Sequence, residues 1–299
     1  MFGSHLDIDL NGLTRRWTDQ VSAVLVVPTD LRTTDVIGFE PSSEEPLLLP
    51  LPRTGQAVMS LTDDGRHLIV RDNPPPWQKP GPLRLLRLSD GSEHQLPRES
   101  GEVDNQAALS SDGTRIAILG SDPECDYFDL MDFPDGTRRR LWLDPDEGSD
   151  TSIRPAWSPD GSLIAFTCLY EDDETQDHEA KTLVFDNSGS LVSCYPLTIM
   201  PRGGNVWADD HTLVFEHAYE GTQHTADPHT GQQHQLRQSM AFYGAAPFHR
   251  VIYSERSSPH SETLHTCAPD GTDSRPLLTL HQPHEVLTLH LARQLTHHL

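Results

Sequence analysis

The stretch Ala156-Trp157-Ser158-Pro159-Asp160-Gly161-Ser162-Leu163-Ile164-Ala165-Phe166 has the pattern of a strand end, a tight turn and a second, mostly apolar strand. Asp-Gly between two β-rich runs is a strong hairpin signal, because glycine adopts a positive φ without a steric cost. Asp64-Gly65 and Asp112-Gly113 precede similar apolar runs, and successive glycines of the three turns are 48 residues apart. The hairpin therefore belongs to an internal repeat, in which Trp157 and Ile164 are expected to pack between neighbouring repeats.

Weaker copies extend the series in both directions. They lie at Thr18-Asp19-Gln20, around Asp209-Asp210 and at Pro247-Phe248-His249, which makes six repeats. A second set of turns interleaves with the first: Ser89-Asp90-Gly91, Pro134-Asp135-Gly136, Asn187-Ser188-Gly189, His229-Thr230-Gly231 and Pro269-Asp270-Gly271. Most repeats therefore hold two hairpins, or four strands, which is the content of one propeller blade.

This organisation predicts an all-β fold, a six-bladed β-propeller of four-stranded antiparallel blades, as one domain over 1–299. The predicted blades are 6–52, 55–97, 104–144, 152–198, 204–237 and 240–280, followed by a closing strand or tail at 281–299. Leu287, Leu289 and Leu291 alternate with polar residues as in a strand, and a helix through Leu287, Leu291 and Leu295 fits nearly as well. The run from Leu6 to Leu10 alternates too, so either terminus is a candidate for the strand that closes the ring.

The turn from Ser158 to Gly161, preceded by Trp157 and followed by an apolar strand, resembles the repeat of TolB-like (WD40-like) β-propellers. Partial matches surround Asp64, Asp112 and Asp210. The resemblance implies the fold over most of the chain but not a function, because relatives include a periplasmic scaffold of the cell envelope and the non-catalytic propellers of prolyl oligopeptidase-like peptidases. The sequence departs from both, since it shows neither an apparent export signal nor a hydrolase domain.

The composition is strongly acidic, with 22 Lys and Arg against 45 Asp and Glu and a formal net charge of −23. This charge disfavours nucleic acids and anionic membranes as partners. The first residues lack a signal-peptide pattern, and no apolar run is long enough for a membrane helix. The four cysteines form no CxxC pair, and neither the 17 histidines nor the acidic run at 171–174 has metal-site spacing. We therefore expect a cytoplasmic protein without a metal or a cofactor.

Propeller geometry places the two tight turns of each blade on one face and the longer, polar connections on the opposite face. Recognition residues usually lie on such connections. The predicted ligand-binding set, expected near the mouth of a central channel, consists of Gln56, Asp104, Asn105, Arg154, Arg202, Asn205 and Tyr243.

Two features of these connections have alternative interpretations. Arg154 and Arg202 either hold an anionic ligand or neutralise acids such as Asp144. Trp77, beside three prolines, is either a partner-binding aromatic residue or a lid packed on its own loop.

The sequence contains no pattern for nucleophilic catalysis or phosphate binding, such as GxSxG, SxxK or GxxxxGK[ST]. It therefore favours a non-catalytic scaffold that binds a protein, a peptide or another ligand on its long-loop face. The alternative is an enzyme, a hydrolase, lyase or cyclase, that acts on a small anionic substrate at the channel mouth.

Overall fold

The structure of the chain is a computed structural model. It describes residues 6–28, 34–41, 45–53, 55–62, 64–72, 80–133, 135–144, 149–171, 178–197, 205–217, 222–238, 241–246, 250–258, 261–281 and 288–291. These residues fall into two compact units. Unit 1 comprises Met1–Arg98, Ser254–Thr266 and Arg275–Leu299, and unit 2 comprises Glu99–Tyr253 and Cys267–Ser274. The single-domain organisation stays a prediction.

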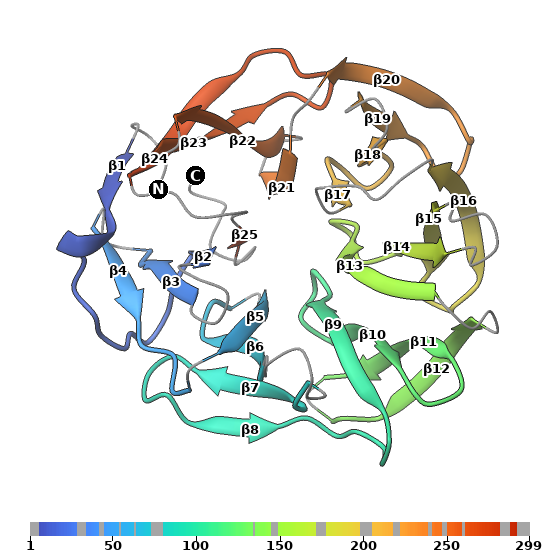
Figure 1. The fold of residues 1–299 in the computed structure, drawn as a ribbon, viewed down its shortest axis with the longest axis horizontal. Helices are drawn as coiled ribbons and strands as arrows, with labels where there is room; N and C mark the ends of the chain where they lie inside the picture. The colour runs from blue at the N-terminus through green and yellow to red at the C-terminus, as the bar shows by residue number, and fades with distance from the viewer. Residues whose placement is uncertain are drawn as a thin grey trace. The chain divides into compact units, whose positions relative to one another are not determined.

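The strands form six sheets, which are the blades of the propeller (Figure 1). Blade 1 contains β2 (Ala23–Pro28), β3 (Thr34–Phe39), β4 (Pro46–Leu49) and β25 (Thr288–Leu291). Blade 2 contains β5 (Gln56–Leu61), β6 (His67–Asp72), β7 (Leu83–Arg87) and β8 (Glu93–Gln95). Blade 3 contains β9 (Val103–Leu109), β10 (Arg115–Ser121), β11 (Asp126–Asp132) and β12 (Arg138–Asp144).

The other three sheets form blades 4 to 6, and each blade again takes its strands in chain order. Blade 4 contains β13 (Ser149–Trp157), β14 (Leu163–Glu171), β15 (His178–Asp186) and β16 (Leu191–Leu197). Blade 5 contains β17 (Val206–Trp207), β18 (Leu213–His217), β19 (Thr222–Ala226) and β20 (Gln233–Gln238). Blade 6 contains β21 (Ala241–Ala246), β22 (Arg250–Ser258), β23 (Ser261–Cys267) and β24 (Arg275–His281). The predicted fold class, a six-bladed β-propeller of four-stranded blades, is confirmed.

Segments near both ends of the chain contribute strands to the sheets of blades 6 and 1. β1 (Leu6–Asp9) pairs in parallel with β24 and is followed by a short 3-10 helix, η1 (Leu10–Gly12). β25 pairs antiparallel with β2 and supplies the first strand of blade 1. The two candidates for closure are therefore both strands. In the part of the chain that the structure describes, no helix is long and apolar enough to cross a membrane.

The first turn of blade 4 explains the recurrence of Asp-Gly. Gly161 has a φ of 71°, and its N–H donates to the carbonyl of Ser158 at 2.9 Å. The carboxylate of Asp160 accepts from the N–H of Ser162 at 3.0 Å and from the hydroxyl of Ser158 at 2.6 Å. Burial opposes ionisation of Asp160, but these hydrogen bonds outweigh it and lower its pKa. The turn is thus fixed by residues within the motif itself.

Adjacent sheets of unit 2 share an apolar core. The rings of Phe128, Phe166 and Phe185 lie with centroids 4.9 to 5.5 Å apart. Trp157 joins this cluster with Ile164, and its indole N–H donates to the carbonyl of Ala108 in blade 3 at 3.0 Å. The predicted packing of Trp157 and Ile164 between blades is confirmed.

The same contact recurs one blade further along the chain. Trp207 of blade 5 donates its indole N–H to the carbonyl of Ala156 in blade 4 at 2.9 Å. The tryptophan of these repeats therefore links each sheet to the one before it.

We predict that Trp157→Phe lowers the free energy of unfolding by about 1–3 kcal/mol, because the buried carbonyl of Ala108 loses its donor. Chemical denaturation at equilibrium measures the change. Leu191→Ala is the control, because the Leu191 side chain is exposed, and a shift within about 0.5 kcal/mol is expected there. Equal stability of Trp157→Phe and the wild type would contradict the structural role of this hydrogen bond.

Candidate functional site

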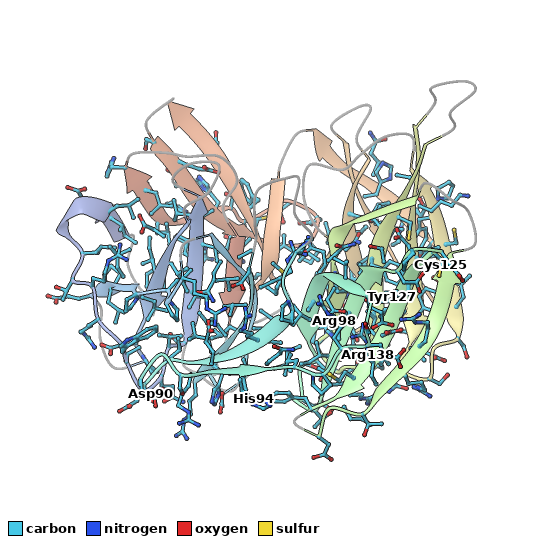
Figure 2. The ribbon with its side chains drawn as sticks, turned by 60° about the horizontal axis from the view of Figure 1, so that its bottom comes forward. Asp90, His94, Arg98, Cys125, Tyr127 and Arg138 are labelled. Carbon is cyan, nitrogen blue, oxygen red and sulfur yellow. The ribbon has the colours of Figure 1, made fainter. Side chains whose placement is uncertain are left out.

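Three consecutive cations, Arg138, Arg139 and Arg140, begin strand β12 of blade 3. Because side chains alternate between the two faces of a strand, the first and third arginines share a face. Arg138 and Arg140 enter a cluster of carboxylates, whereas Arg139 is exposed. We call this set the blade 3 cluster; its members are Glu102, Asp104, Asp122, Tyr127, Asp129, Arg138 and Arg140. Figure 2 labels Tyr127 and Arg138 within blade 3.

Arg138 is the buried centre of this cluster, with a side chain that is 12% exposed. Its Nε lies 2.6 Å from Asp129 and its Nη2 lies 2.7 Å from Asp104, while its Nη1 is 3.5 Å from Glu102. The side chains of both aspartates are only 2% exposed. One guanidinium group therefore connects β9, β11 and the residue that precedes β9.

Arg140 links the same sheet to its connecting segments. Its Nε lies 3.0 Å from Asp129, its Nη1 lies 3.3 Å from Asp122, and its Nη2 contacts Glu102. Asp122 belongs to the β10–β11 connection, and Glu102 belongs to the junction between blades 2 and 3. Arg140 thus holds two separate connections at the same end of blade 3.

Tyr127 packs against both arginines of the blade 3 cluster. Its ring lies under both arginines, with the guanidinium carbon of Arg140 4.0 Å from the ring centroid. Its hydroxyl donates to Asp104 at 3.0 Å. Gly120 lies opposite Tyr127 in the β10–β11 ladder, and a Cβ at Gly120 would clash with the tyrosine ring and with the carbonyl of Val103. Gly120 is therefore required for this close approach.

The protonation states of the cluster follow from its geometry. Burial opposes the charge on Arg138 and Arg140, but the neighbouring carboxylates outweigh it and raise the pKa of both guanidinium groups. Burial, and then Asp104, raise the pKa of Tyr127 above its usual value. The arginines therefore remain cationic and the tyrosine remains neutral, so Arg138 and Arg140 meet the carboxylates as charged guanidinium groups and Tyr127 contributes a hydroxyl donor.

The β10–β11 connection is ordered around Asp122. Its carboxylate accepts the backbone N–H groups of Glu124 at 2.8 Å and Cys125 at 3.0 Å, and the first of these bonds is the largest influence that lowers its pKa. Burial and the contact with Asp122 raise the pKa of the Cys125 thiol, which opposes thiolate formation. In the described part of the chain, no three His, Cys, Asp or Glu side chains are placed to hold a metal ion.

Blade 2 contains the same arrangement with the charges reversed. Arg84 stands seven residues before the glycine of the second turn, as Asp129 does in blade 3, and Glu93 and Arg138 each follow that glycine by two. Arg84 lies 2.6 Å from Asp72 and 3.9 Å from Glu93. Blades 2 and 3 therefore both have an ion pair between the third and fourth strands. The cation is on the third strand in blade 2 and on the fourth strand in blade 3.

No protein-family model matches the chain, and no curated protein matches it either. The structure of TolB from Acinetobacter baumannii is similar, with a TM-score of 0.58 at 17% identity over 91% of this chain and 66% of that one. The chain has a TolB-like propeller fold. It spans about two thirds of the length of the A. baumannii TolB.

Two other solved structures are also similar to this chain. A structure of a nidogen/laminin complex matches with a TM-score of 0.60 at 13% identity, over 91% of this chain and 99% of that one. An oligogalacturonate lyase in complex with manganese matches with a TM-score of 0.53 at 13% identity, over 89% and 75% of the two chains. At these identities the likeness concerns the fold alone.

The structure places four members of the predicted ligand-binding set of this TolB-like propeller. Gln56 begins β5, is 2% exposed and donates to Glu93 at 2.5 Å. Asp104 belongs to the blade 3 cluster, and Asn105 beside it donates to the hydroxyl of Ser121 at 3.4 Å. Asn205 is 7% exposed and donates to Thr167 of blade 4 at 3.0 Å. Their role in ligand binding stays a prediction.

The other predicted residues are not described in the same way. Arg154 and Tyr243 lie in β13 and β21, but their side chains are outside the described part of the structure. Arg202 and Trp77 lie outside the described residues. Sequence reasoning missed Arg138, Arg140, Asp129 and Glu102. The available signal was the run of three arginines, whose alternation on a strand directs two of them to one face.

We predict that Arg138→Met lowers the free energy of unfolding by about 3–5 kcal/mol, because it leaves buried carboxylates without their cation. Arg139→Met is the matched control on the next residue, with an expected change within about 0.5 kcal/mol. Equilibrium denaturation of both variants provides the comparison. Equal destabilisation of the two would show that the cluster does not hold blade 3 together.

Proposed function

We propose that this propeller is a non-catalytic scaffold that binds a basic segment of a protein or a peptide. The binding surface is the connection surface of blade 3, which we define as the exposed residues Glu99, Ser100, Pro123 and Glu124. The single observation that carries the proposal is the double contact of Arg140, which joins the segments that bear these residues through Glu102 and Asp122.

The connection surface of blade 3 is ordered by hydrogen bonds and ion pairs of the chain itself, without a partner. The N–H of Glu99 donates to Glu102 at 3.4 Å, and the N–H of Glu124 donates to Asp122 at 2.8 Å. Both carboxylates contact the guanidinium group of Arg140. A preorganised surface loses less conformational entropy when a partner binds, which favours a role in recognition.

The charge of the surface favours a basic partner. Its two exposed ionisable residues, Glu99 and Glu124, are both acidic, and the cluster beneath them has four carboxylates against two guanidinium groups. The whole chain has a formal charge of −23. Complementary charge accelerates association and makes it sensitive to salt.

The enzyme alternative requires cations that are available to an anionic substrate. In the described part of blade 3, Arg138 and Arg140 contact carboxylates of the chain itself. An anion would have to compete with buried aspartates for them. The fold neighbours include an enzyme, the oligogalacturonate lyase, as well as TolB and a nidogen/laminin complex, so the proposal rests on the cluster and not on the fold.

We predict that Glu124→Lys abolishes capture of a partner that the wild-type protein retains at near-equal molar amounts. Asp135→Lys is the matched control, with the same change of charge in the β11–β12 turn at the other end of the blade. Immobilised proteins are incubated with extract from the source cells, and bound proteins are quantified by mass spectrometry at low and high salt.

The expected partner has a basic exposed segment, dissociates as salt increases and is retained by the control. Identical capture by both variants, or recovery of no partner in near-equal amounts, would exclude the connection surface of blade 3 as the binding site. Folding of each variant is checked by its denaturation midpoint.

A further inference from the structure

The chain contains six Asp-Gly dipeptides, all of them in turns between strands. They are Asp64-Gly65, Asp90-Gly91, Asp112-Gly113, Asp135-Gly136, Asp160-Gly161 and Asp270-Gly271. Aspartate followed by glycine is chemically prone to isomerisation, because no β-carbon shields the glycine nitrogen from the aspartate side chain. Since the following residue is the same in all six, differences between them in the native protein come from the fold.

In five of the six turns the aspartate carboxylate is held by the chain. It accepts the backbone N–H of the second residue after it at 2.9 to 3.0 Å. Additional hydroxyl donors contact Asp112 and Asp160. Hydrogen bonds of this kind restrict rotation of the side chain.

Asp135 differs from the other five. It is exposed, and within the described residues its carboxylate has no hydrogen bond or ion pair. The glycine does not make the difference, because Gly136 donates its N–H to Asp132 at 2.8 Å, much as Gly161 donates to Ser158 at 2.9 Å. The side chain of Asp135 is therefore free to turn towards the nitrogen of Gly136.

We propose that Asp135-Gly136 is the isoaspartate-forming site among the six Asp-Gly dipeptides of the native protein. The nitrogen of Gly136 bonds to Cγ of the protonated Asp135 carboxyl, the bond from Cγ to the hydroxyl oxygen breaks, and that hydroxyl leaves with the amide proton of Gly136 as one water. Water then opens the resulting imide at the main-chain carbonyl. One water is lost and one is gained, so the mass is unchanged and no oxidant or reductant takes part.

The position of this site connects the modification to the blade 3 cluster. The turn is closed by the N–H of Asp132, which donates to the carbonyl of Thr137 at 2.8 Å, directly before Arg138. An isoaspartate adds one backbone atom inside this turn. The register that directs Arg138 towards Asp129 and Asp104 then changes, and the modified chain becomes a substrate for an isoaspartate-specific methyltransferase.

The test compares the native and the denatured protein. The full chain is incubated at neutral pH with and without guanidinium chloride and digested, and isoaspartate at each of the six sites is quantified by labelling with the methyltransferase and by peptide separation. We expect about tenfold more isoaspartate at Asp135 than at any other site in the native protein, which is the effect of one hydrogen bond to a charged group. In denaturant, the six sites are expected to react at similar rates.

One variant controls the assignment. Asp135→Ser removes most of the isoaspartate that is found at the six Asp-Gly sites of the native protein if the assignment is right. The proposal is overturned if native Asp135 accumulates no more isoaspartate than Asp112 or Asp160, or if the distribution among the six sites is the same with and without denaturant.

Discussion

A buried guanidinium group must find hydrogen-bond acceptors within the fold, and Arg138 imposes this requirement on blade 3. Its side chain is 12% exposed and lies between Asp104 of β9 and Asp129 of β11. A slip of one residue in either strand would direct its aspartate to the opposite face. Buried ion pairs contribute little net stability compared with apolar packing but are costly to break. The ion pairs of Arg138 therefore act mainly by fixing the register of β9 and β11. Arg140 then extends the same constraint to Glu102 and Asp122 outside the sheet.

The fold was predictable because its strongest signals are local. The turn at Asp160-Gly161 is held by Ser158 and Ser162, so five consecutive positions specify it. The degenerate copy in blade 5 keeps the essential contact without glycine, since Asp209 accepts the N–H groups of His211 and Thr212. Closure was not decidable from the sequence, because Leu6–Asp9 and Thr288–Leu291 alternate equally well and both are strands.

The candidate site was less predictable because it depends on register across strands that are far apart in the sequence. The sequence predicted Asp104 as a ligand-binding residue. In the structure Asp104 pairs with Arg138, and Arg138 also pairs with Asp129, whose side chain lies on the same face of the sheet. The comparison of Arg84 and Glu93 with Asp129 and Arg138 shows that only the position recurs between blades, while the sign of each charge is exchanged. A search for conserved charge in the repeat would therefore have missed it.

The claim that Arg140 holds two connections as one surface is tested most directly by hydrogen exchange of three backbone amides. Glu99 donates to Glu102, and Glu124 and Cys125 donate to Asp122. In Arg140→Ala, exchange at all three amides is predicted to accelerate together, whereas Arg139→Ala leaves them unchanged. Acceleration in only one of the two segments, or in neither, would contradict the account.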